Sequence, residues 1–188
     1  MQTLNNRESY GWATVALHWL AAAGVIAMLW TGFNAGEAEE AHDRARHMQL
    51  MGLHISVGVA FFAIWTARIA GHYLQPQPVE AKGPALINFI ARATQNLLLL
   101  FLALQIISGP LMIWAHARPI QAFGFAIASP FATRNESIDH IADLMHLVGR
   151  WGLVAFIALH ALAAVKRLVI DRDGVFTRML IPGAKLKA

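Results

Sequence analysis

Four histidines lie within long apolar stretches of the sequence, where an ionisable side chain is costly and usually has a function. His18 and His54 occupy the first two stretches, and His146 and His160 share the fourth. The last two are 14 residues apart, which is four turns of a slightly supercoiled helix and a rise of about 21 Å. His146 and His160 are therefore predicted to share one helix face at two depths.

The first two histidines match these depths when the chain is threaded back and forth. His18 lies six residues from the start of the first stretch, and His54 lies six residues from the start of the second. Because consecutive spans run in opposite directions, His18 falls at the depth of His160 and His54 at the depth of His146. The sequence predicts two histidine pairs on facing helices, each able to hold one flat cofactor.

Paired imidazoles of this kind favour haem as the cofactor. Neutral imidazole ligates haem iron, and helix bundles place such ligands on facing helices. Two axial ligands leave no open position at the metal, which favours electron transfer. Zinc needs three or four converging ligands, and the nearest rival cluster is Asp139, His140, Asp143 and His146. The chain has no cysteine, which excludes covalently attached c-type haem and thiolate-held iron-sulfur clusters.

The surrounding composition predicts a membrane protein that positions these histidines. Of 188 residues, 57% are hydrophobic and 14% are charged, against roughly 45–50% and about 25% in soluble domains. We expect an all-α, integral membrane four-helix bundle, formed as one domain over residues 1–188 with a tail at 166–188. Four stretches are long enough to cross a bilayer of about 30 Å: 12–33, 48–67, 93–114 and 141–165.

Basic residues in the flanks predict the orientation. Arg7 precedes the first span, Arg68, Lys82 and Arg92 surround the second connection, and further basic residues follow the fourth span. By the positive-inside rule these segments are cytoplasmic, so both termini are expected on that side. Tryptophans fit the same depths, with Trp12 and Trp65 near the inner ends of their spans, and Trp30 and Trp114 near the outer ends.

The connections differ in composition. The first is acidic, with Glu37, Glu39, Glu40 and Asp43 beside two arginines, and is expected outside. The second is a proline-containing linker, and the third, from His116 to His140, is long and apolar, so that it either lies on the membrane surface or packs over the bundle. The pI of about 10.0 reflects this topology rather than nucleic-acid binding, because the basic residues form no single stripe.

Other residues share faces with the histidines. Gly58 lies one turn after His54 and would let a macrocycle approach the backbone. Gly32, 14 residues after His18, would leave room at the outer level. Arg68 reaches the inner level, where it either pairs with a haem propionate or extends to the surface. Arg150, one turn after His146, is expected to pair with a propionate or an anionic substrate.

Taken together, these residues resemble the bacterial cytochrome b561 family. The matching features are Ala16-Leu17-His18-Trp19-Leu20, His54 with Gly58 and Arg68, His146 with His160, the segment Pro119 to Gly124, and the closing run Ile170 to Met179. The third span departs from the family pattern, since Gln95 and Ile106 stand where many members have a histidine and a proline. Any quinone or proton role of that span is thereby in doubt.

The resemblance implies two non-covalent haem b groups, with axial pairs His18/His160 and His54/His146, in a bacterial inner membrane. It also implies electron exchange between ubiquinone and an outer-side donor or acceptor, and one branch of the family resembles superoxide oxidase. The protein would then be a superoxide:ubiquinone oxidoreductase, or otherwise an electron-transfer protein with a periplasmic redox partner. Outer-side arginines could attract superoxide: Arg44, Arg46, Arg118, Arg134 and Arg150.

Several alternatives stay open at this point. The chain could be a membrane anchor that relays electrons between quinone and a soluble dehydrogenase or hydrogenase. It could also be a small metal-binding transporter that uses His42, His47 and His140. An apolar quinone cleft could form around Phe123 with Gln95, Asn96 or Gln105. The basic tail is expected to contact anionic lipid headgroups.

Overall fold

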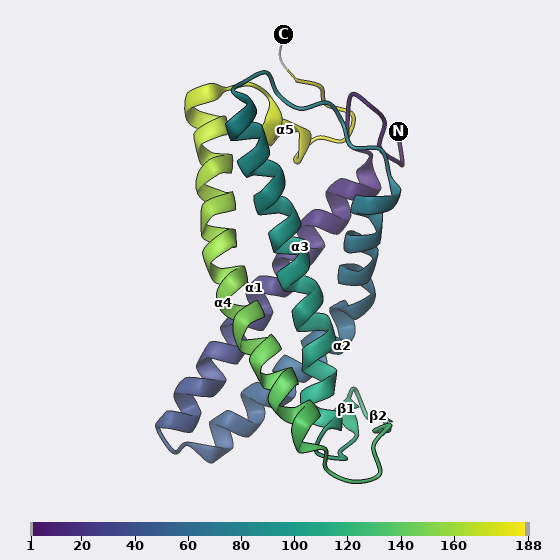
Figure 1. The fold of residues 1–188 in the computed structure, drawn as a ribbon, viewed down its shortest axis with the longest axis vertical. Coiled ribbons are helices and arrows are strands. Elements are labelled where there is room, and N and C mark those ends of the chain that lie inside the picture. The colour runs from purple at the N-terminus through teal and green to yellow at the C-terminus, as the bar shows by residue number, and fades with distance from the viewer. Residues whose placement is uncertain (1, 187–188) are drawn as a thin grey trace.

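The fold is dominated by four long helices, seen in a computed structural model that describes residues 2–186. The helices are α1 (Trp12–Glu40), α2 (Arg44–Leu74), α3 (Ala85–Trp114) and α4 (Glu136–Lys166). A short π-helix, η1 (Arg167–Asp171), continues α4, and a single turn, α5 (Val175–Arg178), follows it. Both chain ends lie at one end of the bundle, here called the terminal end (Figure 1).

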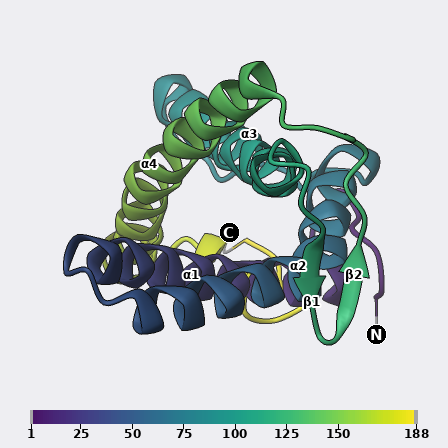
Figure 2. The same ribbon diagram turned by 90° about the horizontal axis from the view of Figure 1, so that it is seen from below.

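The bundle consists of two helix pairs. Helix α1 packs along α2 and α3 along α4, whereas the two pairs meet each other less extensively. Seen along the bundle, α1 and α2 lie side by side across one side of the molecule, and α3 and α4 lie opposite them (Figure 2). The predicted all-α four-helix bundle is therefore confirmed, and each pair is an antiparallel hairpin of consecutive helices.

An apolar core joins all four helices at mid-height. Its buried members are Ala21 and Val25 of α1, Trp65 of α2, Leu102 of α3 and Leu153 of α4. Trp65, which the sequence places at a membrane interface, is only 5% exposed, and its indole donates a hydrogen bond to the Ala21 carbonyl at 3.1 Å. Its role is therefore core packing between α1 and α2, because an indole is mainly apolar and needs one acceptor when buried.

All four helices are long and apolar enough to cross a membrane, among the residues that the structure describes. They also extend beyond the predicted spans, since α1 continues to Glu40 and α2 begins at Arg44. The acidic first connection is consequently reduced to residues 41–43, and its glutamates belong to the last turn of α1 and the turn before it. Asp43 caps α2 by accepting a hydrogen bond from the Arg46 backbone N–H at 3.0 Å.

The third connection folds into a β-hairpin at the end of the bundle opposite the termini, here called the hairpin end (Figure 1). Strands β1 (Ile120–Ala122) and β2 (Phe125–Ile127) pair antiparallel, with Ala122 opposite Phe125. Strand β1 contacts α2 and α3. Phe123 and Phe125 stay 64% and 76% exposed. The hairpin thus packs over the bundle, as one of the two predictions had it, and it also presents an apolar tip. Contact of this tip with the membrane surface stays a prediction.

Three segments distant in sequence are joined at the terminal end. We call them the terminal cap: residues 2–11, the linker 75–84 and the C-terminal residues 172–186. The Val79 N–H donates to the Arg7 carbonyl, and the Gly183 N–H donates to the Tyr10 carbonyl, both at 2.9 Å. Lys185 pairs with Glu8 and holds the pKa of that carboxyl below its usual range. The tail is therefore folded under the bundle rather than extended.

Candidate functional site

Two histidines of α4, His146 and His160, each lie next to a histidine of the α1/α2 pair. The His18 and His160 rings have centroids 6.2 Å apart, near the terminal end. The His54 and His146 rings have centroids 6.3 Å apart, near the hairpin end. Each pair spans the boundary between α1/α2 and α3/α4. The structure thus brings together the residues that the sequence pairs by depth.

The ring separations match two imidazoles that bind one metal from opposite sides. A metal–imidazole bond is about 2.0 Å long and the ring centre lies about 1 Å beyond the nitrogen, so such rings have centroids about 6 Å apart. The rings are inclined at 60° in one pair and 67° in the other. Both pairs therefore fit a haem held through two axial imidazoles.

Buried hydroxyl groups orient both rings of the hairpin-end pair. Thr31 Oγ1 lies 2.9 Å from His54 Nδ1, and Ser108 Oγ lies 3.1 Å from His146 Nδ1. Thr31 is 1% exposed and Ser108 is 0% exposed, so water does not compete for these contacts. A ligand ring with its second nitrogen hydrogen-bonded has a fixed orientation and tautomer.

The hydrogen bonds of Thr31 indicate which nitrogen of His54 carries the proton. The Thr31 hydroxyl already has two carbonyls as acceptors, those of Ala27 at 2.8 Å and Met28 at 3.1 Å. Its oxygen is therefore free to accept from His54 Nδ1–H. The lone pair then resides on Nε2 of His54, which is the state that binds a metal.

Gly32 of α1 lies against the His54 ring. A Cβ built on Gly32 would stand 3.3 Å from His54 Cε1, which is tighter than most such contacts. The room predicted beside the outer level is therefore filled by the His54 imidazole itself. At Gly58 a Cβ would meet only Met28 Cε, at an ordinary 3.5 Å. Protein packing does not require glycine there, and the predicted close approach of a macrocycle stays a prediction.

The terminal-end pair has a different environment. The His18 ring lies edge-on to Trp19 with centroids 5.2 Å apart, and the Trp19 indole donates to the Met179 carbonyl at 2.6 Å. Arg68, near the terminal end of α2, lies close to both His18 and His160. This end therefore combines a nearby guanidinium with contacts from the terminal cap, and the predicted inner-level position of Arg68 agrees with its place.

Arg150 stands beside the hairpin-end pair, between two aromatic rings. Its guanidinium carbon is 5.5 Å from the Phe33 ring centre and 5.6 Å from that of Trp151. Its buried Nε has no hydrogen-bond partner among residues 2–186. A cation held by rings and with a free buried donor can receive an anionic oxygen. That role for Arg150 stays a prediction.

The alternative metal sites predicted from the sequence do not form within the described residues. No three His, Asp or Glu side chains converge as a metal site anywhere in the described part of the chain. Instead, Asp139 lies 3.0 Å from Arg134 and 3.4 Å from His116. His47 Nδ1 lies 3.0 Å from the Ala35 carbonyl. The histidines suggested for a transporter are thus engaged separately or exposed.

The polar residues predicted to line a quinone cleft beside Phe123 do not do so in the structure. Gln95 and Asn96 lie about 18 residues before the end of α3 at the hairpin, so at about 1.5 Å per residue they are some 27 Å from its loop. Gln105 instead donates to the His146 carbonyl at 2.8 Å. The open cleft beside Phe123, of about 550 Å³, is lined by α2 and the hairpin: Gly52, Ser56 and Gln121 to Ala126.

Sequence reasoning missed Thr31, Ser108 and the terminal cap. The available signal for the first two was a small hydroxyl residue within an apolar helix, a pattern that packing explains equally well. Two basic residues where α4 passes into η1 have acidic partners that the sequence did not indicate, since Lys166 pairs with Asp171 at 2.7 Å and Arg167 pairs with Asp173. The expected contact of the basic tail with lipid headgroups stays a prediction.

Comparison with known proteins relates the chain to one family. A family model described as prokaryotic cytochrome b561 matches residues 9–182. The chain is also similar to the protein named cytochrome b561 homolog 2 of Escherichia coli strain K12. The two are 29% identical over 182 residues, which cover 96% of this chain and 95% of the relative.

Thr31→Val tests the role of the hydroxyl at His54. The substitution keeps the shape but leaves His54 Nδ1–H without its acceptor, and loss of such a partner typically weakens binding 10- to 100-fold. We expect faster loss of one haem b to an excess of a haem-scavenging protein, followed by absorption spectroscopy. Thr66→Val is the matched control, because the exposed Thr66 hydroxyl bonds only its own helix, at the Phe62 carbonyl. Equal haem loss in both variants would contradict this role.

Proposed function

Because the chain belongs to the prokaryotic cytochrome b561 family, we propose that it is a di-haem carrier that exchanges electrons between ubiquinone and a one-electron partner outside the membrane. Family membership makes it a membrane protein that binds haem b and transfers electrons. The number of haems, the quinone and the outside partner are the proposed parts. Their basis is the pair of histidine sites at two depths.

The separation of the imidazoles is the observation that carries the proposal. Two pairs with centroids 6.2 and 6.3 Å apart each suit one haem. In this assignment His18 and His160 are the axial ligands at the terminal end, and His54 and His146 are those at the hairpin end. A haem ligated on both faces supplies one-electron transfer without an open position for oxygen.

The remaining site residues have proposed electrostatic and steric roles. Arg150 would bind an anionic oxygen at the hairpin-end haem, and Arg68 would act on the terminal-end haem. Gly58 would admit the macrocycle edge next to α2. The apolar cluster of Ala21, Val25, Trp65, Leu102 and Leu153 separates the two levels and excludes water between them.

The cleft beside the hairpin supports quinone access from the membrane. Its volume of about 550 Å³ lies within the range of small-molecule sites, about 300–1,000 Å³. Its rim carries the exposed Phe123 and Phe125, and Gln121 adds polar atoms. An open cleft that combines exposed aromatic side chains with polar atoms would suit a quinone headgroup.

Charge at the hairpin end bears on superoxide as the outside partner. The five arginines of this end are accompanied by seven acidic residues: Glu37, Glu39, Glu40, Asp43, Glu136, Asp139 and Asp143. Arg134 is also neutralised by Asp139 at 3.0 Å. The surface of this end therefore attracts anions only weakly over long range. Binding of superoxide at Arg150 is better supported than steering of superoxide by a cationic surface.

Single histidine variants test the ligand assignment. His146→Ala and His160→Ala should each reduce the haem content from about two to about one per chain, because a haem with one axial ligand is held weakly. Potentiometric titration of the purified variants should show that different haems are lost. His140→Ala on the same helix is the control, since His140 is exposed. Loss of the same haem in both variants would refute the pairing.

Electron transfer is tested with the isolated protein. We expect a ubiquinol analogue, mixed with the oxidised detergent-solubilised protein in a stopped-flow instrument, to reduce the haem within milliseconds to seconds, and superoxide to do so in a separate experiment. Reduction that occurs only after addition of a co-purifying hydrophilic protein would support the anchor-subunit alternative instead. Reduction by quinol without any response to superoxide would remove superoxide as partner.

A further inference from the structure

A small cleft opens between η1 and α5 at the terminal end. It has a volume of about 150 Å³ and is lined by two arginines, one hydroxyl residue and apolar groups: Arg167, Leu168, Arg172, Gly174, Phe176 and Thr177. This volume equals about five water molecules at about 30 Å³ each, so a phosphate group fits. Within residues 2–186, no acidic side chain belongs to the lining. The cleft is therefore open to a small anion.

Arg172 gives the cleft a cation whose position is fixed by the protein. This residue ends η1 with a φ of 51°, and its backbone N–H donates to the Arg167 carbonyl at 2.8 Å. Its side-chain Nε donates to the Val169 carbonyl at 3.0 Å. The two Nη nitrogens make no hydrogen bond within residues 2–186. A guanidinium held at Nε in this way presents two Nη donors that match the oxygens of one oxyanion.

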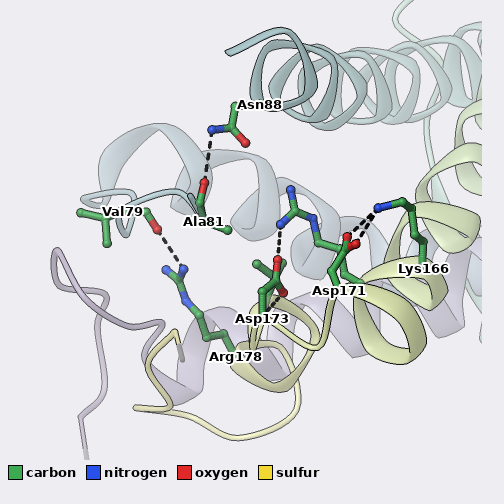
Figure 3. A network of polar contacts seen from close by, with 9 residues as sticks. Val79, Ala81, Asn88, Lys166, Asp171, Asp173 and Arg178 are labelled. Carbon is green, nitrogen blue, oxygen red and sulfur yellow. Dashed lines mark hydrogen bonds and ion pairs between the residues drawn. The ribbon is translucent and has the colours of Figure 1, made fainter. Parts of the chain in front are cut away.

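The other basic side chains beside the cleft already have acidic partners. Lys166 pairs with Asp171 at 2.7 Å, and Arg167 pairs with Asp173 (Figure 3). The turn from the end of α4 to the start of α5 contains three basic side chains and two acidic ones. These two pairs therefore leave the charge of Arg172 without a counter-charge in this turn, and an anion in the cleft would supply one.

Helix α5 is fixed to the rest of the terminal cap, so one wall of the cleft is held in place. Arg178 is only 4% exposed, donates from Nη1 to the Val79 carbonyl at 2.9 Å, and lies 5.1 Å from the Tyr10 ring centre. Figure 3 shows this side chain reaching from α5 to the linker. The next residue, Met179, accepts a hydrogen bond from the Trp19 indole at 2.6 Å. A ligand in the cleft would therefore stabilise a cap that is joined to α1.

Exposed apolar side chains adjoin the cleft. Leu168, Val169 and Ile170 of η1 are 46%, 55% and 71% exposed, and they continue the apolar surface of α4 beyond Lys166. Basic residues that follow the apolar length of a membrane-spanning helix lie at the depth of the lipid headgroups. The cleft is therefore expected at the level of lipid phosphates, beside a surface suited to acyl chains.

We propose that the cleft between η1 and α5 binds the phosphate of an anionic phospholipid, with the two Nη nitrogens of Arg172 donating to its oxygens. The Thr177 hydroxyl in the lining is a second donor. The acyl chains would lie against Leu168, Val169 and Ile170. This lipid site is separate from the histidine pairs, and the proposal does not depend on a haem.

Inorganic phosphate is the other source of the same oxygens. It has no apolar part, so it would bury none of the exposed surface of Leu168, Val169 and Ile170. A phospholipid uses both the cationic cleft and this surface at once. The juxtaposition of the two therefore favours the lipid.

The test is the affinity of the purified full-length protein for dioleoylphosphatidylglycerol, measured by native mass spectrometry during a lipid titration in detergent. Arg172→Gln should weaken the tightest lipid site about tenfold, the effect of losing one hydrogen-bonded charged contact. Arg7→Gln is the matched control, because Arg7 is an exposed arginine at the same end of the bundle but outside the cleft. Its tightest site should be unchanged. Equal affinities in all three proteins, or equal weakening in both variants, would overturn the proposal.

Two further probes identify the part of the lipid that is bound. Dioleoylglycerol has the same chains without the phosphate, so Arg172→Gln should not change its binding. Inorganic phosphate at the concentration of the lipid should not displace phosphatidylglycerol from the wild-type protein. An equal effect of Arg172→Gln on both lipids would show that the phosphate is not the bound group. Displacement by inorganic phosphate would assign the cleft to soluble anions, and either result would overturn the proposal.

A purely structural role of Arg172 is distinguishable from lipid binding. Phosphatidylglycerol should raise the unfolding temperature of the wild-type protein more than that of Arg172→Gln, because only the wild type has the full affinity. A lower unfolding temperature of the variant with the same gain from lipid would refute the proposal. Should the glutamine variant fail to fold, Arg172→Lys keeps the charge and loses the fork. It should weaken the tightest site by a smaller factor, and an unchanged affinity would refute the proposal.

Discussion

The separation of about 6 Å between paired imidazoles is the constraint on which the rest of the structure depends. Two helices that pack closely leave no room for a flat group between their side chains, whereas helices that are too far apart cannot supply both ligands. The division of the bundle into the pairs α1/α2 and α3/α4 meets both requirements. Each pair is stabilised by its own packing, and the histidines and the shared apolar core lie across the boundary between them.

The two ends of the bundle hold their histidines by different means. At the hairpin end, hydroxyls from α1 and α3 bind the Nδ1 atoms of His54 and His146, and Gly32 makes room for the His54 ring. At the terminal end, Trp19 lies edge-on to the His18 ring, and Arg68 of α2 lies close to both histidines. The hairpin end also has a guanidinium beside its pair, that of Arg150.

The sequence was sufficient to predict the four helices, the family and the pairing of the four histidines, because apolar length and the 14-residue spacing on α4 are local properties. It could not predict Trp65 as a core residue, since an indole near a span end is equally typical of a membrane interface. The hydroxyls of Thr31 and Ser108 were missed because their function depends on which helix they face. Arg178 was unpredictable for the same reason, since its burial requires contacts with Tyr10 and Val79, both far away in sequence.

The most direct test of the account is the ratio of haem to protein in the purified wild-type chain, determined by the pyridine haemochrome method together with a dithionite-reduced minus oxidised spectrum. Four histidines in two pairs predict about two b-type haems per chain, both six-coordinate and low-spin in the oxidised and reduced states. A folded protein that carries about one haem after expression with ample haem supply would contradict the two-site account. A folded protein that carries none would contradict the assignment of both pairs as haem ligands.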